Sequence, residues 1–277
     1  MEFLTPPEIA EGFVETGQKK AGLSAVNQVI LGFAAGAFVA FASAGTNSAV
    51  HTIESVGLSK ALSGALFSTA LMLILIAGGE LFTGNCLMVI AWVEGKISLL
   101  SMLRNWILVY VGNFFGSVFL ACLISQSGQL EFSGGLLGGF TLRQAAYKAE
   151  LPFLGSFLMG LLCNWLVCAA VWAAAAARDI AGKVLAIFFP IWLFVSSGFE
   201  HCVANMYYIP AGILAKDTPL FVERAAAMGA APESIASLSW GSFLTSLLPV
   251  TLGNVVGGGF FVGFVYWLVY LTGRKQK

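Results

Sequence analysis

Gly79-Glu80-Leu81-Phe82-Thr83-Gly84-Asn85 interrupts one long apolar run of this sequence, and Phe199-Glu200-His201-Cys202-Val203-Ala204-Asn205 interrupts another. In both stretches a glutamate stands five residues before an asparagine, and the flanking residues are apolar enough to span a membrane. An ionisable side chain at membrane depth is costly unless it faces a cavity or a partner group. A chain that carries this arrangement twice, at matching places, is expected to form a path for a solute through the bilayer.

Composition places the whole chain in a membrane. Of its 277 residues, 58% are hydrophobic and 10% are charged, with a mean hydropathy of +0.86, whereas soluble domains carry about 25% charged residues. The formal net charge is zero, so no basic surface indicates nucleic acid as a partner. No signal-peptide pattern precedes the first long apolar run near Val29, and we expect no cleaved leader.

The cysteines and the known motifs give no sign of metal, disulfide or enzymatic chemistry. All five cysteines lie in apolar runs without a Cys-x2-Cys pair, which indicates small packing residues: Cys86, Cys122, Cys163, Cys168 and Cys202. The sequence contains no His-Glu-x2-His, no catalytic serine pairing and no cofactor-binding motif. We therefore predict no cofactor and a protein that is not an enzyme.

Six apolar segments are candidates for membrane spans, each of which needs about 20 residues. The second and fifth are short, and each stops at one of the two polar interruptions and resumes as a brief apolar run, Cys86–Val93 or Met206–Ala215. Interrupted segments at corresponding places in two halves are the best sequence indication of a substrate site in a transporter. The expected spans are 28–46, 61–79, 106–125, 153–177, 184–198 and 244–271.

The third and sixth spans share a second pattern. Gly112-Asn113-Phe114-Phe115-Gly116 and Gly253-Asn254-Val255-Val256-Gly257 both have the form Gly-Asn-x2-Gly. Spans one to three and four to six are therefore interpreted as two copies of one unit. Because three is odd, the second copy enters the membrane from the opposite side, and the repeat is inverted. We predict one all-α transmembrane domain over 1–277, with repeats at 27–126 and 150–272.

Glycines spaced four apart predict close packing between spans. Gly32 and Gly36, like the glycine pairs of the two Gly-Asn-x2-Gly motifs, form small-x3-small patterns that let helix backbones approach each other. We expect them to pack spans together, within a protomer or between protomers, rather than to line a pore.

Residues 1–26 are expected to form a helix at the cytoplasmic membrane face. Thr5-Pro6-Pro7-Glu8 is a capping box with proline at the first helical position, and Ile9, Phe13 and Val14 give a partial apolar stripe. An interfacial helix is the favoured interpretation, and a gating role is the alternative.

Lysine and arginine set the expected orientation in the inner (cytoplasmic) membrane. With both termini inside, nine basic residues fall on the cytoplasmic side and five on the other, and this excess favours cytoplasmic termini. The nine are Lys19, Lys20, Lys96, Arg104, Arg178, Lys183, Arg274, Lys275 and Lys277; the five are Lys60, Arg143, Lys148, Lys216 and Arg224.

His201 is the leading candidate for contact with a solute. It interrupts a membrane-depth segment, whereas the other histidine, His51, falls in an ordinary loop. The functional interpretation is a hydrogen-bond donor in a pore that can change charge near neutral pH; a packed neutral histidine is the alternative. Adjacent residues on a helix point about 100° apart, so Glu200 is not expected to share the lumen with His201.

The glutamates at the breaks are better interpreted as structural. A broken helix frees backbone groups that lipid cannot satisfy, and Glu80 and Glu200, with Asn85 and Asn205, can bond to them. Proton carriage is the alternative. The resuming segments point helix N-termini at the membrane middle, which favours an anion or a polar solute over a cation.

Apolar residues flank the predicted site. Phe194 lies seven residues before His201, two helical turns away, and Leu81 and Phe82 lie just before Thr83. If they line the lumen, they form constrictions on either side of the polar centre; ordinary packing in the core or against lipid is the alternative.

These blocks resemble the formate/nitrite transporter family. Together with the six-span layout, the residues that carry the resemblance over nearly the whole chain are Gly79–Asn85, Gly198–Met206 and Gly253-Asn254. Membership implies a homopentamer of aquaporin-like protomers, each with one pore for a small monovalent anion: formate, nitrite, hydrosulfide or, in some branches, lactate. The sequence looks close to the hydrosulfide branch. Thr83-Gly84-Asn85 differs from the Thr-Ser pattern of the formate branch, which weakens formate without deciding among the other anions.

The resemblance also implies roles for single residues. It places Thr83 opposite His201, with Lys148 in the outer vestibule and Asn254 as a lumen asparagine in span six. Leu71, Leu81, Phe82 and Val167 then form the cytoplasmic constriction, and Phe67 and Phe194 form the outer one.

Two other classes of transport protein compete with this interpretation. An aquaporin-like channel for neutral solutes shares the inverted layout, but the Asn-Pro-Ala tripeptide of aquaporins does not occur here. A proton-coupled anion carrier has the same sequence features as a channel and stays open as an alternative. A neutral acid that has taken its proton from His201 would cross the constrictions more easily than an anion, because it avoids most of the desolvation cost.

Overall fold

Six helical stretches in this computed structural model, which describes residues 3–272, are long and apolar enough to cross a membrane, as predicted. They are Ala25–Val50, Val56–Gly78, Leu99–Gln126, Phe153–Ala176, Ile180–Ser197 and Trp240–Tyr270. Three of the basic residues used for the orientation, Arg274, Lys275 and Lys277, lie outside the described residues.

The first half of the chain places a short helix before three spans. Its elements are α1 (Pro6–Gly22), α2 (Ala25–Val50), α3 (Val56–Met72) with its π-helical continuation η1 (Leu73–Gly78), α4 (Phe82–Asn85), η2 (Cys86–Met88), α5 (Val89–Val93) and α6 (Leu99–Gln126). Thus the second span breaks after Gly78 and resumes as α4, η2 and α5.

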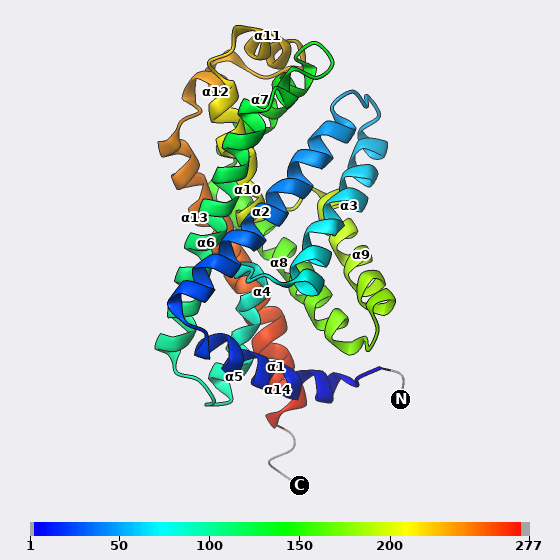
Figure 1. The fold of residues 1–277 in the computed structure, drawn as a ribbon, viewed down its shortest axis with the longest axis vertical. Helices are drawn as coiled ribbons and strands as arrows, with labels where there is room; N and C mark the ends of the chain where they lie inside the picture. The colour runs from blue at the N-terminus through cyan, green and yellow to red at the C-terminus, as the bar shows by residue number, and fades with distance from the viewer. Residues whose placement is uncertain (1–2, 273–277) are drawn as a thin grey trace.

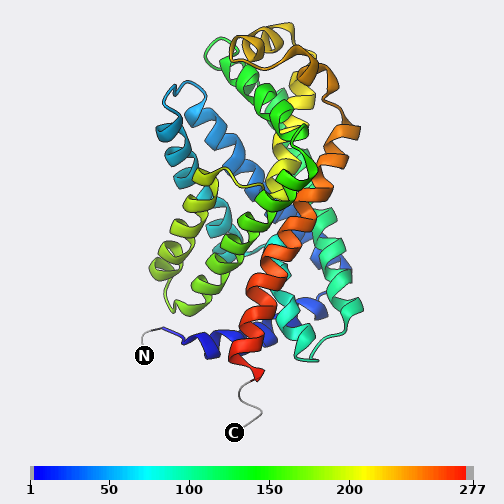
Figure 2. The ribbon, with the colours of Figure 1, turned by 180° about the vertical axis from the view of Figure 1, so that it is seen from behind.

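The second half has the same order, with additional short helices between its last two long elements. Its elements are η3 (Gln129–Glu131), α7 (Leu136–Ala149), α8 (Phe153–Ala176), α9 (Ile180–Ser197), α10 (Cys202–Ala215), α11 (Pro219–Ala227), α12 (Pro232–Ser237), α13 (Trp240–Val255), η4 (Val256–Phe264) and α14 (Val265–Tyr270). The helix α7 precedes the second set of spans as α1 precedes the first. In Figures 1 and 2, α1 and α14 lie at one end of the long axis and α7 and α11 at the other.

The glycine pairs allow close helix contacts in the protomer. A Cβ atom on Gly36 would collide with the backbone of Asn113 in α6, and one on Gly116 with the backbone of Phe33 in α2. The second half repeats this, because Cβ atoms on Gly253 and Gly257 of the last span would collide with the backbone of α8. The small-x3-small patterns therefore pack spans within one protomer, one of the two predicted arrangements.

The N-terminal helix α1 forms at the predicted cap and packs on Cys86, Leu87 and Ile90, which follow the first break. Glu8 accepts hydrogen bonds from the backbone N–H and hydroxyl of Thr5 at 2.7 and 2.6 Å, which lower the pKa of its carboxyl. Ile9 and Phe13 are buried, and the Phe13 ring stacks on Trp172 of α8 at 5.3 Å between centroids. The apolar stripe of α1 therefore packs against other helices of the protein, and α1 lies at one end of the spans.

Candidate functional site

Both breaks turn the chain at a glycine and then run extended for a few residues. Gly78 ends η1 with φ +104°, and Gly198 follows α9 with φ +75°, which are left-handed values that favour glycine. After each glycine the backbone is extended up to the residue that caps the next helix, Leu81 before α4 and His201 before α10. Figure 1 shows that α4 and α10 both begin near the middle of the long axis.

Asn113 holds the first break through its side-chain amide. Its Oδ1 accepts the first amide of α4, Phe82 N–H, at 2.9 Å, and its Nδ2 donates to the carbonyls of Gly32 and Glu80 at 2.8 and 2.9 Å. The side chain is fully buried. Two backbone groups that the break frees are therefore satisfied by one asparagine.

Asn254 makes the equivalent three bonds at the second break. Its Oδ1 accepts Cys202 N–H at 2.9 Å, and its Nδ2 donates to the carbonyls of Gly160 and Glu200 at 2.7 and 3.1 Å. It too is fully buried and lines neither cavity described below. The structure thus places Asn254, expected from the resemblance in the lumen, against the broken backbone.

Each break glutamate pairs with a lysine and with the asparagine five residues later. The bonds are Lys20 Nζ to Glu80 Oε1 at 2.6 Å, Asn85 Nδ2 to Glu80 Oε2 at 2.7 Å, Lys148 Nζ to Glu200 Oε1 at 2.7 Å and Asn205 Nδ2 to Glu200 Oε2 at 2.8 Å. The expected bonds from freed backbone amides go to Asn113 and Asn254 instead. Each carboxylate therefore links its break to a helix that is distant in the sequence, α1 for Glu80 and α7 for Glu200.

The two lysines occupy matching places before the two sets of spans. Lys20 is near the end of α1 and five residues before Ala25, where α2 begins; Lys148 is near the end of α7 and five residues before Phe153, where α8 begins. The repeat that relates the two halves of the chain therefore includes α1 and α7. This equal spacing of the lysines appears with the observed helix starts, and the predicted spans, which begin at 28 and 153, do not have it.

His201 and Thr83 meet in the centre of the protomer. The Nε2 atom of His201 lies 3.0 Å from Thr83 Oγ1, and Nδ1 accepts the backbone N–H of Ala204 at 3.2 Å. Because Nδ1 is an acceptor, the neutral ring carries its proton on Nε2 and donates it to the Thr83 hydroxyl. The predicted pairing of these residues is present, and both side chains are buried.

Helix α8 fixes Thr83 in place. The Thr83 carbonyl accepts Asn164 Nδ2 at 3.1 Å and the Cys168 thiol at 3.3 Å. The Asn164 amide also donates to the Asn254 carbonyl at 2.7 Å, which joins the two breaks and α8 in one network. The hydroxyl facing His201 is therefore held by a rigid backbone.

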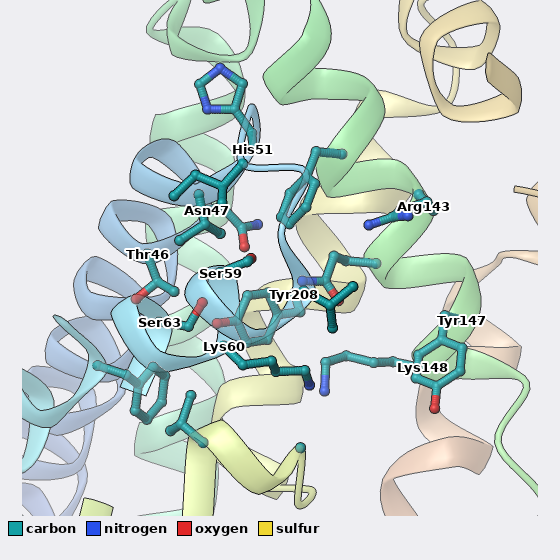
Figure 3. A pocket seen from close by; sticks show the side chains of 18 of the residues that line it. Thr46, Asn47, His51, Ser59, Lys60, Ser63, Arg143, Tyr147, Lys148 and Tyr208 are labelled. Atoms are coloured by element: carbon teal, nitrogen blue, oxygen red, sulfur yellow. The ribbon is translucent and has the colours of Figure 1, made fainter. Parts of the chain in front are cut away.

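Two cavities approach the centre from opposite ends of the protomer. The α7-side cavity, of about 630 Å³, is lined by His201 at the centre of the protomer. Figure 3 shows His51 and Lys148 in the same lining. The α1-side cavity, of about 350 Å³, is bordered by α1 residues such as Phe13 and Lys20 and reaches Gly84. The His201–Thr83 bond lies between these cavities.

The predicted constriction residues divide into three groups. Phe67 and Phe194 both line the α7-side cavity, with their rings edge to face at 5.9 Å, and Phe194 lies 6.2 Å from the His201 ring. Leu71 and Leu81 line the α1-side cavity. Val167 is buried in the same apolar cluster and lines neither cavity.

Phe82 points toward α6. Its ring packs edge to face on Tyr110 at 4.9 Å and on Trp106 at 6.2 Å, and it lines neither cavity. The sequence left two interpretations open for Phe82, a constriction of the lumen or ordinary packing. In the structure its ring is packed in the core.

Neither cavity has an excess of acidic side chains. The α7-side cavity is lined by three cations and two acids, a balance of +1 with histidine neutral: Lys60, Arg143 and Lys148 against Glu54 and Glu200. The α1-side cavity is lined by Lys20 and Lys183 and by no acid among the described residues. Two cavity lysines take part in neither ion pair of the described residues: Lys60 in the α7-side cavity and Lys183 in the α1-side cavity.

Comparison with known proteins identifies the family of this arrangement. The family model described as "Formate/nitrite transporter" matches residues 7–268. The chain belongs to the formate/nitrite transporter family. This confirms the resemblance carried by the two breaks and the Gly-Asn motif, and a transporter family agrees with the prediction that the protein is not an enzyme.

The relatives match over nearly their whole length. "Formate channel FocA" of Haemophilus influenzae is 38% identical over 94% of this chain and 92% of its own, and FocA of Escherichia coli K12 is 35% identical over 98% and 95%. The "Uncharacterized transporter YrhG" of Bacillus subtilis is 37% identical over 98% and 95%. A solved "Pentameric formate channel with formate bound" is 40% identical, with TM-score 0.80 over 89% of this chain and 98% of its own. The predicted fold is therefore that of a multi-pass formate/nitrite transporter protomer.

Proposed function

We propose that this member of the formate/nitrite transporter family is a homopentameric channel for small monovalent anions, with formate as its first candidate substrate. The observation that carries the proposal is the buried His201–Thr83 pair between two cavities that contain no excess of acid. Two relatives and one similar structure are formate channels by name, and the latter is a pentamer with formate bound.

The α1 end is proposed to face the cytoplasm of a cell with the channel in its inner membrane. The basic residues of the sequence support this orientation. The α7-side cavity then opens to the outside, where Lys60 and Arg143 attract anions from solution. Lys148 adds less, because Glu200 compensates its charge at 2.7 Å.

A hydrogen bond from His201 is the proposed recognition step. An anion entering the apolar constriction between Phe67 and Phe194 loses hydration, which is costly for a charge. The Nε2–H of His201 already donates to Thr83, so an anion can replace the hydroxyl as acceptor and receive the Thr83 O–H as a second donor. Leu71 and Leu81 beyond this pair supply the second apolar constriction.

The same geometry limits His201 as a source of protons. Neutral imidazole must be protonated on Nδ1 before it can release the Nε2 proton, and the Nδ1 lone pair is occupied by the Ala204 N–H at 3.2 Å. Charging the ring therefore breaks the N-terminal cap of α10. We propose that His201 acts first as a neutral donor, and that proton delivery to a basic anion needs local opening at this cap.

Uptake into proteoliposomes tests the proposal. Formate, nitrite, hydrosulfide and lactate are compared from pH 5 to 8 in the wild type, in His201→Phe and in His51→Gln, the matched control at the other histidine. We expect His201→Phe to change both selectivity and pH profile, and His51→Gln, at the lining of the α7-side cavity, to leave selectivity unchanged. An unchanged profile in His201→Phe would refute the role of His201, and accumulation against a gradient would indicate a proton-coupled carrier rather than a channel.

A further inference from the structure

The ring of His51 is placed so that both of its nitrogens can carry a proton. Nδ1 lies 2.8 Å from the Ser48 carbonyl, which can only accept, so Nδ1 carries the proton of the neutral ring and donates it. Nε2 lies 2.9 Å from Ser133 Oγ, and in the neutral ring it accepts the proton of that hydroxyl. When Nε2 takes up a proton, the hydroxyl rotates and its oxygen accepts instead. Charging His51 therefore costs no hydrogen bond.

The other histidine, His201, is surrounded differently. Its Nδ1 accepts the backbone N–H of Ala204 at 3.2 Å, and an amide nitrogen cannot become an acceptor. A second proton on this ring would face that N–H and break the cap of α10. Histidine is the side chain whose charge ordinarily changes between pH 5 and 8. Of the two histidines in the sequence, His51 is thus the one whose hydrogen-bond partners accommodate the charged form.

The position of His51 in the fold also favours a charged ring. His51 is the C-cap of α2, a helix of 26 residues, and the partial negative charge at a helix C-terminus stabilises cations. The side chain is half-buried and lines the α7-side cavity, where water can deliver a proton (Figure 3). His51 takes part in neither ion pair of the described residues, so no carboxylate in direct contact neutralises a charge on its ring.

The charged groups near His51 leave the cavity weakly positive. The charged residues of the cavity lining, with a balance of +1, are Glu54, Lys60, Arg143, Lys148 and Glu200. The loop that carries Ser133 follows Glu131 of η3, and its Gly134 carbonyl accepts a bond from Arg224 Nε at 3.2 Å. An imidazolium at His51 raises the balance of the cavity lining from +1 to +2.

We propose that His51 is a pH-dependent anion-concentrating residue of the α7-side cavity, whose imidazolium forms in acid and attracts small monovalent anions into the cavity. This deepens the proposed function and rests on it. The proton comes from water, and the charge acts over a distance rather than by contact with the solute. Because such attraction is the same for every monovalent anion, His51 affects how much anion enters, and selectivity remains with the His201–Thr83 pair.

Magic-angle-spinning NMR of the untagged protein in proteoliposomes, labelled with nitrogen-15 at histidine, tests the charge. The sequence contains two histidines, so two rings contribute signals, and His51→Gln identifies one of them. At pH 8 we expect His51 as the Nδ1–H tautomer and His201 as the Nε2–H tautomer. At pH 5 the His51 signals should become those of imidazolium, while His201 stays neutral. A His51 ring that stays neutral at pH 5, or a His201 ring that charges first, would overturn the proposal.

Initial formate uptake into the same proteoliposomes tests the effect on anions. A unit charge about 10 Å from an anion in water changes the local anion concentration about twofold. At low salt the uptake ratio of wild type to His51→Gln should therefore be about 1 at pH 8 and about 2 at pH 5, and comparison at equal pH cancels the effect of pH on formate itself. The ratio at pH 5 should return to about 1 in about 1 M salt, which screens the charge. His51→Lys, with a permanent charge, should take up about twice as much formate as the wild type at pH 8.

Ser133→Gly is the matched control for the hydrogen bond. It removes the hydroxyl beside Nε2, and glycine fits the backbone there, whose φ is +56°. This variant should keep the pH dependence of the wild type, because water can replace the hydroxyl. Loss of that dependence would assign the effect to the bond between the two loops and overturn the role of the charge.

Equal formate uptake by wild type and His51→Gln at pH 5 in low salt would also overturn the proposal, although the proposed function would stand because formate crosses. Absence of formate flux in the wild type at every pH would instead defeat the proposed function, and the NMR spectra would still decide the charge of His51. Elution as the wild-type oligomer on size-exclusion chromatography shows that a variant is folded. His51→Gln carries the test if His51→Lys or Ser133→Gly does not assemble.

Discussion

Replacing Asn254 by leucine should destabilise the protein through the second break. The substitution removes three bonds, but the Gly160 carbonyl lies inside α8 and has a helical partner as well. Cys202 N–H and the Glu200 carbonyl are left buried without their partner. Each such group costs about 1–3 kcal/mol, so the expected loss is about 2–6 kcal/mol per protomer. At about 2–4 °C per kcal/mol for a chain of this size, the melting temperature should fall by about 4–24 °C.

Thermal unfolding of the detergent-solubilised protein, followed by size-exclusion chromatography, measures this loss. Asn113→Leu should cause a similar drop, because Asn113 makes the same three bonds at the first break. Ser117→Ala is the milder control. The Ser117 hydroxyl donates to two carbonyls, at 3.1 and 3.5 Å, so its removal leaves no buried N–H without a partner. If Asn254→Leu melts within about 2 °C of the wild type but loses anion selectivity, the residue acts in the lumen and the structural assignment is wrong.

Three further substitutions probe selectivity, charge and the N-terminal cap. Gly84→Ser should fold normally, because a Cβ atom at this position meets its nearest neighbour at 3.7 Å. It should shift relative uptake toward formate over hydrosulfide. An unchanged ratio of formate to hydrosulfide uptake would show that this position does not affect selectivity. Lys148→Met leaves the Glu200 carboxylate without its cation and should lower anion uptake several-fold, with partial recovery on adding Glu200→Gln. Absence of recovery would argue against the ion pair. Hydrogen bonds from Thr5 hold the Glu8 pKa below its ordinary value of 4.5, so their stabilisation is present above pH 4.5 and lost as pH falls below it. Proteolysis near the N-terminus should therefore quicken in acid for the wild type and vary less with pH for Glu8→Gln.

The sequence was sufficient to locate the breaks because polar residues in apolar runs carry a strong local signal. Glu80 and Glu200 lie where the spans are interrupted, and the pairing of His201 with Thr83 followed from the family resemblance. The lysine partners of the glutamates were not predicted, since Lys20 and Lys148 are 60 and 52 residues away along the chain. Such pairings depend on where α1 and α7 settle against the spans, which local patterns do not determine.

The direction of single side chains at the breaks was also beyond the sequence. Extended backbone between two helices has neither the period of a helix nor a long alternation, so nothing local decides whether Leu81 or Phe82 faces the lumen. The structure directs Leu81 to the α1-side cavity and Phe82 to the aromatic rings of α6. The role of Asn113 was hidden for another reason, because its partners are backbone groups that every residue carries.

The two halves differ at the position that follows the break glutamate, and this difference separates scaffold from site. Glu80 and Glu200 make the same bonds, to a lysine and to an asparagine. The next residue is Leu81 in one half and His201 in the other, at the N-cap of the resuming helix in both. A framework that must close two breaks needs the same groups twice, whereas a single site between the halves needs its donor only once. Residues shared by the halves therefore hold the fold, and His201, the donor proposed for the solute, is found where the repeat is not kept.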